Sequence, residues 1–158
     1  QHAEPQLDRG SDSVETEDPG EPETAVDAAT LQRLNQQLYR WPATFHINTK
    51  LAKQLAKRRA ALGDEEGRIE WAHAEALAFA SLLVEGVPIR LTGQDTVRGT
   101  FSQRHQTLWD AKTGAAYTPI QHLEGARAAF ELHNSPLSEY ATVGFEYGYA
   151  VTAPEAPL

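Results

Sequence analysis

The segment RIEWAHAEALAFASLLVEGVPIRLTG, Arg68 to Gly93, joins a long apolar helix pattern directly to a short strand pattern. Its first part, 68–86, repeats apolar residues at helical spacing from Trp71 to Leu82, and alanines fill most other positions. This pattern predicts a helix that is buried on more than one side. The second part, 87–93, is a short apolar run that predicts a buried strand. A helix that leads straight into a strand is typical of α/β folds.

The sequence beyond Gly93 continues this alternation. QTLWD and AAYTPI flank the turn sequence AKTG and predict a hairpin, AAFELHN (128–134) predicts a second strand, and NSPLSEYATVGFEYGYA (134–150) predicts a helix. The long connection between the two predicted strands, 87–93 and 128–134, is suited to a crossover between parallel strands. The order predicts an α/β fold in which helices flank a parallel sheet.

Two shorter helices are predicted before this unit. AATLQRLNQQLYRWP carries leucines at helical spacing and ends at Pro42. NTKLAKQLAKRRAALG begins with Asn48 as a candidate N-cap and stops at Gly63. Its basic residues are compatible with a nucleic-acid contact, but a solvated helix face is the simpler interpretation.

The first 27 residues differ sharply in composition from the rest. They contain nine acids against one base, Arg9, so this segment has a net charge of −8, equal to that of the whole chain. It almost lacks large apolar groups, which predicts a disordered acidic leader. The remainder is near neutral, which argues against a body built to bind nucleic acid or an anionic membrane.

Several absences narrow the class of protein. The chain contains no cysteine, which excludes a disulfide framework and a thiolate metal site and fits a reducing compartment. No apolar run is long enough to cross a bilayer, and the first residues lack a secretory signal pattern. A soluble intracellular protein is therefore the default expectation. The lack of methionine and the linker-like ending TAPEAPL suggest a piece of a longer protein.

Polar loops follow both predicted strands, at the end where open α/β sheets bind ligands. The first loop, QDTVRGTFSQRH (94–105), is crowded with polar side chains, which a hydrogen-bonded surface loop would also explain. Ser102 and His105 lack the Gly-x-Ser-x-Gly elbow of a hydrolase. The histidines lack the i, i+4 pairing of a helical zinc site, so no metal site is predicted.

The second loop leads into the last predicted helix. Pro136 suits the first turn of a helix, Ser135 or Ser138 can cap it, and Glu139 lies where the helix dipole favours an anion.

The rest of this helix predicts close packing on several sides. Gly144 and Gly148, at i, i+4, would let another backbone approach, although each costs about 1 kcal/mol of helix stability. Burial at the start of such a helix would favour the protonated form of the Glu139 carboxyl group.

Four stretches together carry a family resemblance. GRIEWAHAEALAFASLLVEGVPIRLTGQDTVRGTFSQRH, YTPIQHL and NSPLSEYATVGFEYGYA closely resemble the thiamine-diphosphate-dependent decarboxylating component of the 2-oxoglutarate dehydrogenase complex. LYRWPATFHINTKLAKQLAKRRAAL is similar to the connecting segment of that family. The resemblance covers residues 29–151. It implies a helical connecting segment (28–64) and the N-terminal part of a transketolase-like pyrimidine-binding domain (65–158), preceded by the leader (1–27).

The resemblance also implies roles for three residues. Glu139 would be the catalytic glutamate that hydrogen-bonds the aminopyrimidine ring nitrogen of thiamine diphosphate, and Leu137 and Gln94 would be further cofactor contacts. The implied reaction is the decarboxylation of a 2-oxo acid, 2-oxoglutarate in this family, followed by transfer of the acyl unit to a lipoyl group.

Three further loop residues leave two alternatives open. Arg98, Arg104 and His105 would either reach a substrate carboxylate at the site entrance or stabilise the loop by hydrogen bonds.

The chain departs from the family pattern at one important motif. The Gly-Asp-Gly sequence that holds the diphosphate and Mg²⁺ is missing, because the nearest candidate, LGDEEGR, lacks the second glycine. The Mg²⁺ ligands are therefore expected outside this chain, which alone is expected to be inactive. The implied partners are a second subunit of a homodimer and a lipoyl-bearing acyltransferase component, with no nucleic acid and no membrane. The implied location is the bacterial cytoplasm, or the mitochondrial matrix in a eukaryote.

Two other functions remain open. One is a noncatalytic α/β interaction module with an acidic leader. The other is a thiamine enzyme that acts on another 2-oxo acid, because the residues that would select the substrate are mostly absent.

Overall fold

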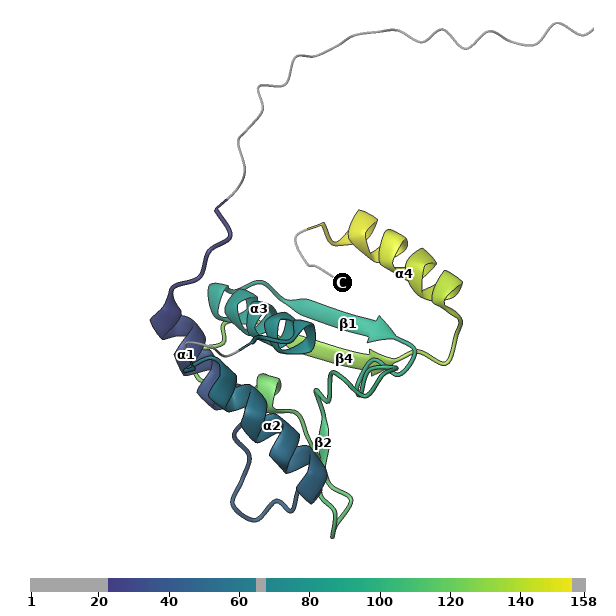
Figure 1. Cartoon of the computed structure of the whole chain (residues 1–158). Helices are drawn as coiled ribbons and strands as arrows, with labels where there is room; N and C mark the ends of the chain where they lie inside the picture. Colours follow the sequence, from purple (N-terminus) through teal and green to yellow (C-terminus); the bar gives the residue numbers. More distant parts are fainter. Residues whose placement is uncertain (1–22, 65–67, 155–158) are drawn as a thin grey trace, which may run out of the picture.

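The computed structural model describes residues 23–64 and 68–154. In chain order the elements are α1 (Ala28–Leu38), α2 (Thr49–Ala61), α3 (Trp71–Glu85), β1 (Ile89–Gly93), β2 (Leu108–Trp109), β3 (Ala116–Tyr117), the 3₁₀ helix η1 (Pro119–His122), β4 (Phe130–Asn134) and α4 (Glu139–Thr152). Figure 1 shows their arrangement. Most of the predicted leader, residues 1–22, lies outside the described residues, so the prediction of disorder there stays a prediction.

The two N-terminal helices begin at capping side chains. The Asp27 carboxylate accepts a hydrogen bond from the backbone N–H of Thr30 (2.8 Å), which satisfies one free donor of α1. The Asn48 side chain accepts hydrogen bonds from the N–H groups of Lys50 and Leu51, which confirms its predicted role at the start of α2.

α3 begins at Trp71, three residues later than the sequence pattern predicts, and ends at Gly86 in the left-handed conformation (φ 99°). Trp71, expected on the buried stripe, is the first residue of the helix and is 91% exposed. Leu77 and Ser81 of the predicted stripe are buried, and the whole buried face follows helical spacing: His73, Ala76, Leu77, Ala80, Ser81 and Leu83.

The two predicted strands form the parallel pair that the sequence order indicates. β1 and β4 run parallel in register from Ile89 opposite Phe130 to Gly93 opposite Asn134. The predicted hairpin is also present, since β2 and β3 pair antiparallel. The α/β prediction is confirmed, with a two-stranded parallel sheet among the described residues.

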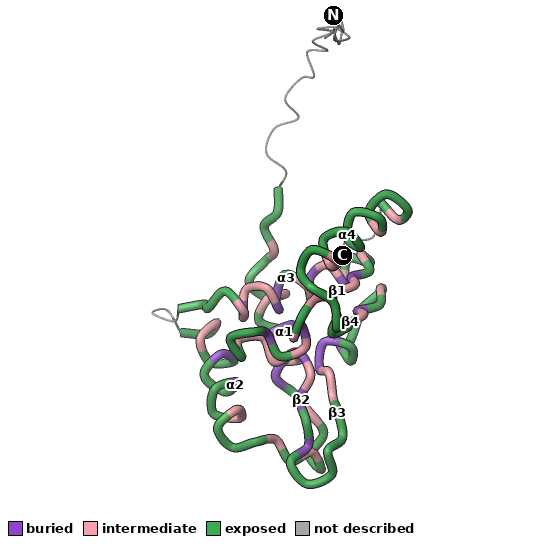
Figure 2. Tube along the Cα trace, turned by 90° about the vertical axis from the view of Figure 1, so that its right-hand side faces the viewer, coloured by how far each residue is buried: buried purple, intermediate pink, exposed green. Residues whose placement is uncertain are grey.

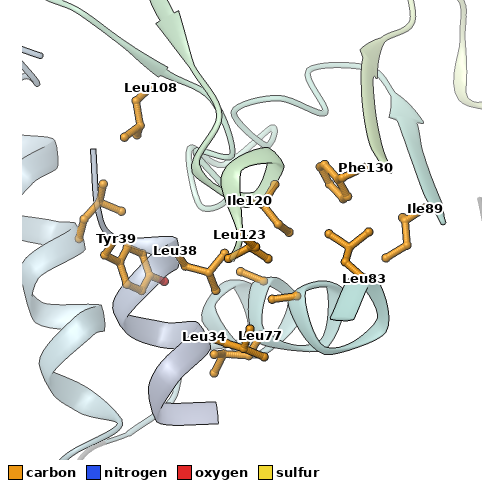
Figure 3. Packing of buried hydrophobic residues seen from close by; sticks show 13 residues of the cluster. Leu34, Leu38, Tyr39, Leu77, Leu83, Ile89, Leu108, Ile120, Leu123 and Phe130 are labelled. Carbon is orange, nitrogen blue, oxygen red and sulfur yellow. The ribbon is translucent and has the colours of Figure 1, made fainter. Parts of the chain in front are cut away.

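A single hydrophobic core joins the N-terminal helices to this sheet. Leu34 and Leu38 of α1 lie in one cluster with Leu77 and Leu83 of α3 and with Phe130 of β4. Figure 3 shows these side chains pointing toward one another, with η1 between the helices and the strands. Residues from both sides of 65–67 therefore share one core, and the domain division at residue 65 stays a prediction.

The last helix, α4, differs most from the prediction. None of its residues is buried, and Figure 2 shows it exposed along almost its whole length. Nothing lies within 4 Å of a Cβ built at Gly144 or Gly148. The close packing predicted for this helix is therefore wrong within the described residues, because α4 contacts little besides one side of β1.

Candidate functional site

The two polar loops begin side by side at the carboxyl edge of the parallel sheet. Gly93 and Asn134 are opposite each other as the last residues of β1 and β4. The Gly93 carbonyl accepts a hydrogen bond from the N–H of Ser135 (2.7 Å), and the Asn134 side-chain oxygen accepts one from the N–H of Val97 (3.0 Å). Each loop is therefore fixed to the strand that carries the other loop.

The first loop holds an unusual backbone conformation. Three residues other than glycine adopt positive φ in it, namely Asp95 (50°), Ser102 (54°) and His105 (49°). Gly99 is buried at φ 84°, and a Cβ there would lie 2.5 Å from the Gln103 side-chain oxygen. Strained positions persist only where the surrounding contacts determine them, so this loop is a defined structure.

Two buried or half-buried arginines supply those contacts. Arg104 donates from Nε and Nη2 to the two oxygens of Glu75 on α3 (2.6 and 3.1 Å) and from Nη1 to the Thr96 carbonyl (2.9 Å). Arg58 of α2 donates to the Gln103 carbonyl (2.6 Å). Such forked, charge-assisted hydrogen bonds hold a loop in one geometry.

Arg98 forms an ion pair within the loop, and His105 is partly buried. Arg98 donates twice to one carboxylate oxygen of Asp95, at 2.9 and 2.5 Å. Burial lowers the pKa of His105 below its usual value, and the positive charge of Arg58 adds to this effect. The observed contacts of Arg98 and Arg104 stabilise the loop, and a role in binding a substrate carboxylate stays a prediction for these two residues and for His105.

The three predicted cofactor contacts lie at this edge of the sheet with their side chains in the open. Gln94 directly follows β1 and is exposed, Leu137 is 59% exposed, and Glu139 is exposed as the first residue of α4. Burial of Glu139, expected from the sequence, is therefore not found within the described residues.

The start of α4 differs in detail from the prediction. Pro136 lies outside the helix, because Ser135–Leu137 forms a turn in which the Ser135 hydroxyl accepts a hydrogen bond from the Leu137 N–H (3.2 Å). Ser138 is the N-cap residue, but its side chain makes no capping hydrogen bond.

A small cavity separates α4 from the sheet. Its volume is about 180 Å³, and Arg90, Thr92, Leu137 and Phe145 are among the residues that line it. Arg90 pairs with Glu131, and its guanidinium lies 5.6 Å from the centre of the Tyr149 ring on α4. Sequence reasoning missed Arg90 and Phe145, although an arginine inside the apolar run VPIRLTG was a usable signal.

The alternation of side chains along β1 and β4 explains this arrangement. Phe130 contacts Phe79 of α3, with ring centres 5.8 Å apart, and Ile89 lies in the same core. Arg90 is next in sequence to Ile89 and therefore faces the opposite side, toward α4. The helices α3 and α4 thus lie on opposite faces of the strand pair.

The described residues form neither a metal-binding cluster nor a membrane-spanning helix. Within residues 23–64 and 68–154, no group of three or more His, Cys, Asp or Glu side chains lies close enough to hold a metal ion. In the same ranges, no helix has both the length and the apolar composition needed to cross a membrane.

Comparisons with known proteins point to one family. The sequence profile of the transketolase pyrimidine-binding domain matches residues 67–158. Three relatives bear the name 2-oxoglutarate dehydrogenase E1 component: those of Geobacillus sp. (strain WCH70), 53% identical over 84% of this chain, Geobacillus kaustophilus (strain HTA426), 51% over 85%, and Bacillus cereus (strain B4264), 53% over 84%. The matched region is 14% of the length of each relative.

Proposed function

Because this chain belongs to the family of transketolase pyrimidine-binding domains, we propose that it forms the aminopyrimidine side of a thiamine diphosphate site in a 2-oxoglutarate dehydrogenase decarboxylating subunit. The names of the relatives support this proposal, although the chain spans only 14% of their length. Residues 28–64 would be the connecting segment and residues 65–158 the first part of the pyrimidine-binding domain.

The observation that carries the proposal is an unused carboxyl group at the ligand-binding edge of a parallel sheet. The Glu139 side chain has no hydrogen-bond partner among the described residues, and Glu139 begins the helix that follows β4. Gln94 is likewise exposed just beyond β1, and Leu137 lines the cavity beside α4. An acid, an amide and an apolar side chain are suited to a flat heteroaromatic ring that carries nitrogen atoms.

Each residue has a separate task in this proposal. Glu139 donates a proton in a hydrogen bond to a ring nitrogen, Gln94 supplies a second polar contact, and Leu137 packs against the ring. When bound, thiamine diphosphate supplies the electron sink for loss of carbon dioxide from the 2-oxo acid. The diphosphate and Mg²⁺ would be held by residues outside this chain.

Glu139 is open to solvent among the described residues, so a closed site needs a cover over it. We propose that a second subunit provides it. The helix α4 exposes large apolar residues that the described residues leave uncovered: Tyr140 (90%), Val143 (61%), Phe145 (48%), Tyr147 (74%) and Val151 (65%). Such a patch favours a protein–protein interface, and a homodimer that shares the site would bury it.

The same relatives suggest a substrate, a partner and a location for this chain. We propose 2-oxoglutarate as the substrate, a lipoyl-bearing acyltransferase component as the acceptor of the acyl unit, and the cytoplasm of a bacterium as the location, because the relatives reported above are bacterial. A different 2-oxo acid would leave the roles of Glu139, Gln94 and Leu137 unchanged.

The test is Glu139→Gln in the intact enzyme, with Glu146→Gln as the matched control on the same helix. Glu146 is also exposed, and it is not assigned to the site. We expect Glu139→Gln to reduce 2-oxoglutarate decarboxylation by about 100-fold or more while the circular dichroism spectrum stays unchanged. Near-normal turnover in this variant, or an equal loss in Glu146→Gln, would refute the assigned role. Robust decarboxylation by the isolated chain would refute the placement of the diphosphate half elsewhere.

A further inference from the structure

The charges of this chain are strongly segregated along the sequence. Residues 1–27 have a net charge of −8, whereas residues 28–64 contain seven basic residues and one acid, Asp64, and have a net charge of +6. The near-neutral total from residue 28 onward hides this basic segment, because the rest of the chain, 65–158, is acidic again at −6. The helices α1 and α2 contain no acidic residue.

The basic segment contains a groove between its two helices. The groove has a volume of about 750 Å³, and it is lined by Tyr39 and Trp41 after α1 and by one face of α2. The α2 side consists largely of small residues spaced four and three apart: Ala52, Ala56, Ala60 and Gly63. Residues at this spacing share one face of a helix, so the floor of the groove leaves room for a backbone.

Cations surround this floor. Arg33 of α1 lies one turn before the groove residue Gln36, and Arg40, just after α1, lines the groove. Arg59 of α2 lies in the groove and donates to the Gln36 side-chain oxygen (2.9 Å). All three arginines are exposed.

Two lysines of α2 are next to the groove floor in sequence. Lys53 and Lys57 are exposed and directly follow the floor positions 52 and 56. One carboxylate near a groove arginine is that of Glu124, 3.9 Å from Arg40, and both side chains are about four-fifths exposed (78% and 81%). An exposed pair of this kind is weak. The groove therefore offers an apolar floor beside exposed basic side chains.

We propose that the acidic segment 1–22 of the same chain binds along this groove. The segment carries seven of the nine acids that precede α1, and it also contains small apolar residues such as Ala3 and Val14. Its charge is opposite to that of the basic residues in and beside the groove, and its backbone fits a floor made of alanine and glycine.

The chain connection makes this occupant the favoured one. The segment joins α1 through residues 23–27, and α1, with 11 residues, is about 16 Å long. A stretch of 22 residues can extend about 70 Å, so it can fold back along α1 and reach the whole groove. A tether of this kind gives an effective concentration in the millimolar range. An acidic stretch of another protein, or a nucleic acid, would have to compete with it.

Zero-length carbodiimide cross-linking tests the proposal in the full chain, because it joins a carboxylate to a lysine that it contacts. The chain has four lysines, of which Lys53 and Lys57 adjoin the groove, Lys50 is near the start of α2 and Lys112 lies on the hairpin. We expect the acids of residues 1–22 to link to Lys53 and Lys57 at least about tenfold more often than to Lys112. Lys112 is exposed and contacts His46, so it serves as an internal control for reactivity.

A pair of charge-reversal variants separates the groove from general electrostatics. Arg40→Glu with Arg59→Glu changes the groove charge without removing a lysine, and both positions are exposed, so the fold should persist. Arg68→Glu with Arg127→Glu changes the net charge equally at exposed positions away from the groove. We expect the first pair to reduce the Lys53 and Lys57 links about tenfold and the second pair less than about twofold.

Three results would overturn the proposal. The first is a cross-link pattern that does not distinguish Lys53 and Lys57 from Lys112. The second is an equal response to the two variant pairs. The third is a fraction of isotopically mixed cross-links close to one half in an equal mixture of ¹⁵N-labelled and unlabelled chains, because random pairing between molecules gives that fraction and would show that the segment binds another molecule.

Discussion

The Asn134 side-chain oxygen accepts a hydrogen bond from the backbone N–H of Val97, 3.0 Å away, and thereby joins the two loops that follow the parallel strands. We expect Asn134→Ala to weaken this connection by about 0.5–1.5 kcal/mol, the net value of an ordinary hydrogen bond. The direct measurement is amide hydrogen exchange at Val97, which should become faster.

Asn134→Asp is the matched control, since it keeps an acceptor oxygen at the same position. Exchange at Val97 should stay close to that of the parent chain in this variant. Unchanged exchange in Asn134→Ala would show that the hydrogen bond does not hold the loop.

Arg104 fixes the loop through three hydrogen bonds to two partners, Glu75 and the Thr96 carbonyl. Lysine cannot reproduce this fork, so Arg104→Lys should lower the free energy of unfolding by about 1–3 kcal/mol. Arg98→Lys is the control, because the pair of Arg98 with Asp95 is more exposed and should cost less than about 1 kcal/mol. Urea titration measures both, and equal effects would contradict an anchoring role for Arg104.

His73 of α3 predicts a dependence of stability on pH. Its ring is fully buried, and Nε2 lies 2.8 Å from Asn35 Oδ1. The Asn35 amide nitrogen donates to the Arg59 carbonyl, so Oδ1 is an acceptor and the neutral ring carries its proton on Nε2. Burial, with a contribution from the charge of Arg58, lowers the pKa of His73 below its usual 6.5.

The direction of the pH effect on stability depends on whether the folded or the unfolded chain protonates His73 more readily. Because the pKa is lower in the folded chain, the unfolded chain takes up the proton first as the pH falls below about 6.5. Stability is therefore fully present above that pH and is lost as the pH falls toward the folded value. His73→Gln should show a smaller loss between about pH 6.5 and pH 5 in urea titrations, and its stability at about pH 8 gives the packing cost separately.

A second histidine contributes to the same pH range. The pKa of His105 is also lowered, first by burial, so His73→Gln alone should flatten the curve only in part. The double variant with His105→Gln should flatten it further. An unchanged slope in both variants would contradict this account of the acid-sensitive step.

The sequence predicts the elements well where local patterns determine them. Apolar periodicity identifies the helices and strands, and a side-chain cap such as Asn48 can be read directly from the sequence. The parallel pairing of β1 with β4 follows from the length of the connection between them. These features depend on residues that are close in sequence or on a general topological rule.

The predictions fail where the outcome depends on what covers a surface. The apolar pattern of α4 indicates burial. Among the described residues, however, α4 faces only the strand pair, across a small cavity, and none of its residues is buried. The contacts of Arg104 with Glu75 and of Arg58 with Gln103 join residues 29 and 45 positions apart. No local pattern specifies such a pair, and the sequence therefore left the role of Arg104 open between substrate binding and loop stability.

The glycines of α4 offer a test of whether another subunit covers this helix. In the isolated chain, nothing lies within 4 Å of a Cβ built at Gly148, so Gly148→Ala should stabilise the chain by about 0.5–1 kcal/mol through helix propensity alone. If a second subunit approaches the helix at this glycine, the added methyl group must instead weaken the dimer. We therefore expect thermal unfolding of the isolated chain to shift upward and the dimer dissociation constant of the intact enzyme to rise. Glu146→Ala, on the same helix, is the control, because it improves helix propensity without filling a notch between helices. A Gly148→Ala variant that stabilises both forms equally would show that this glycine does not admit a partner, and the interface would then have to lie on another face of α4.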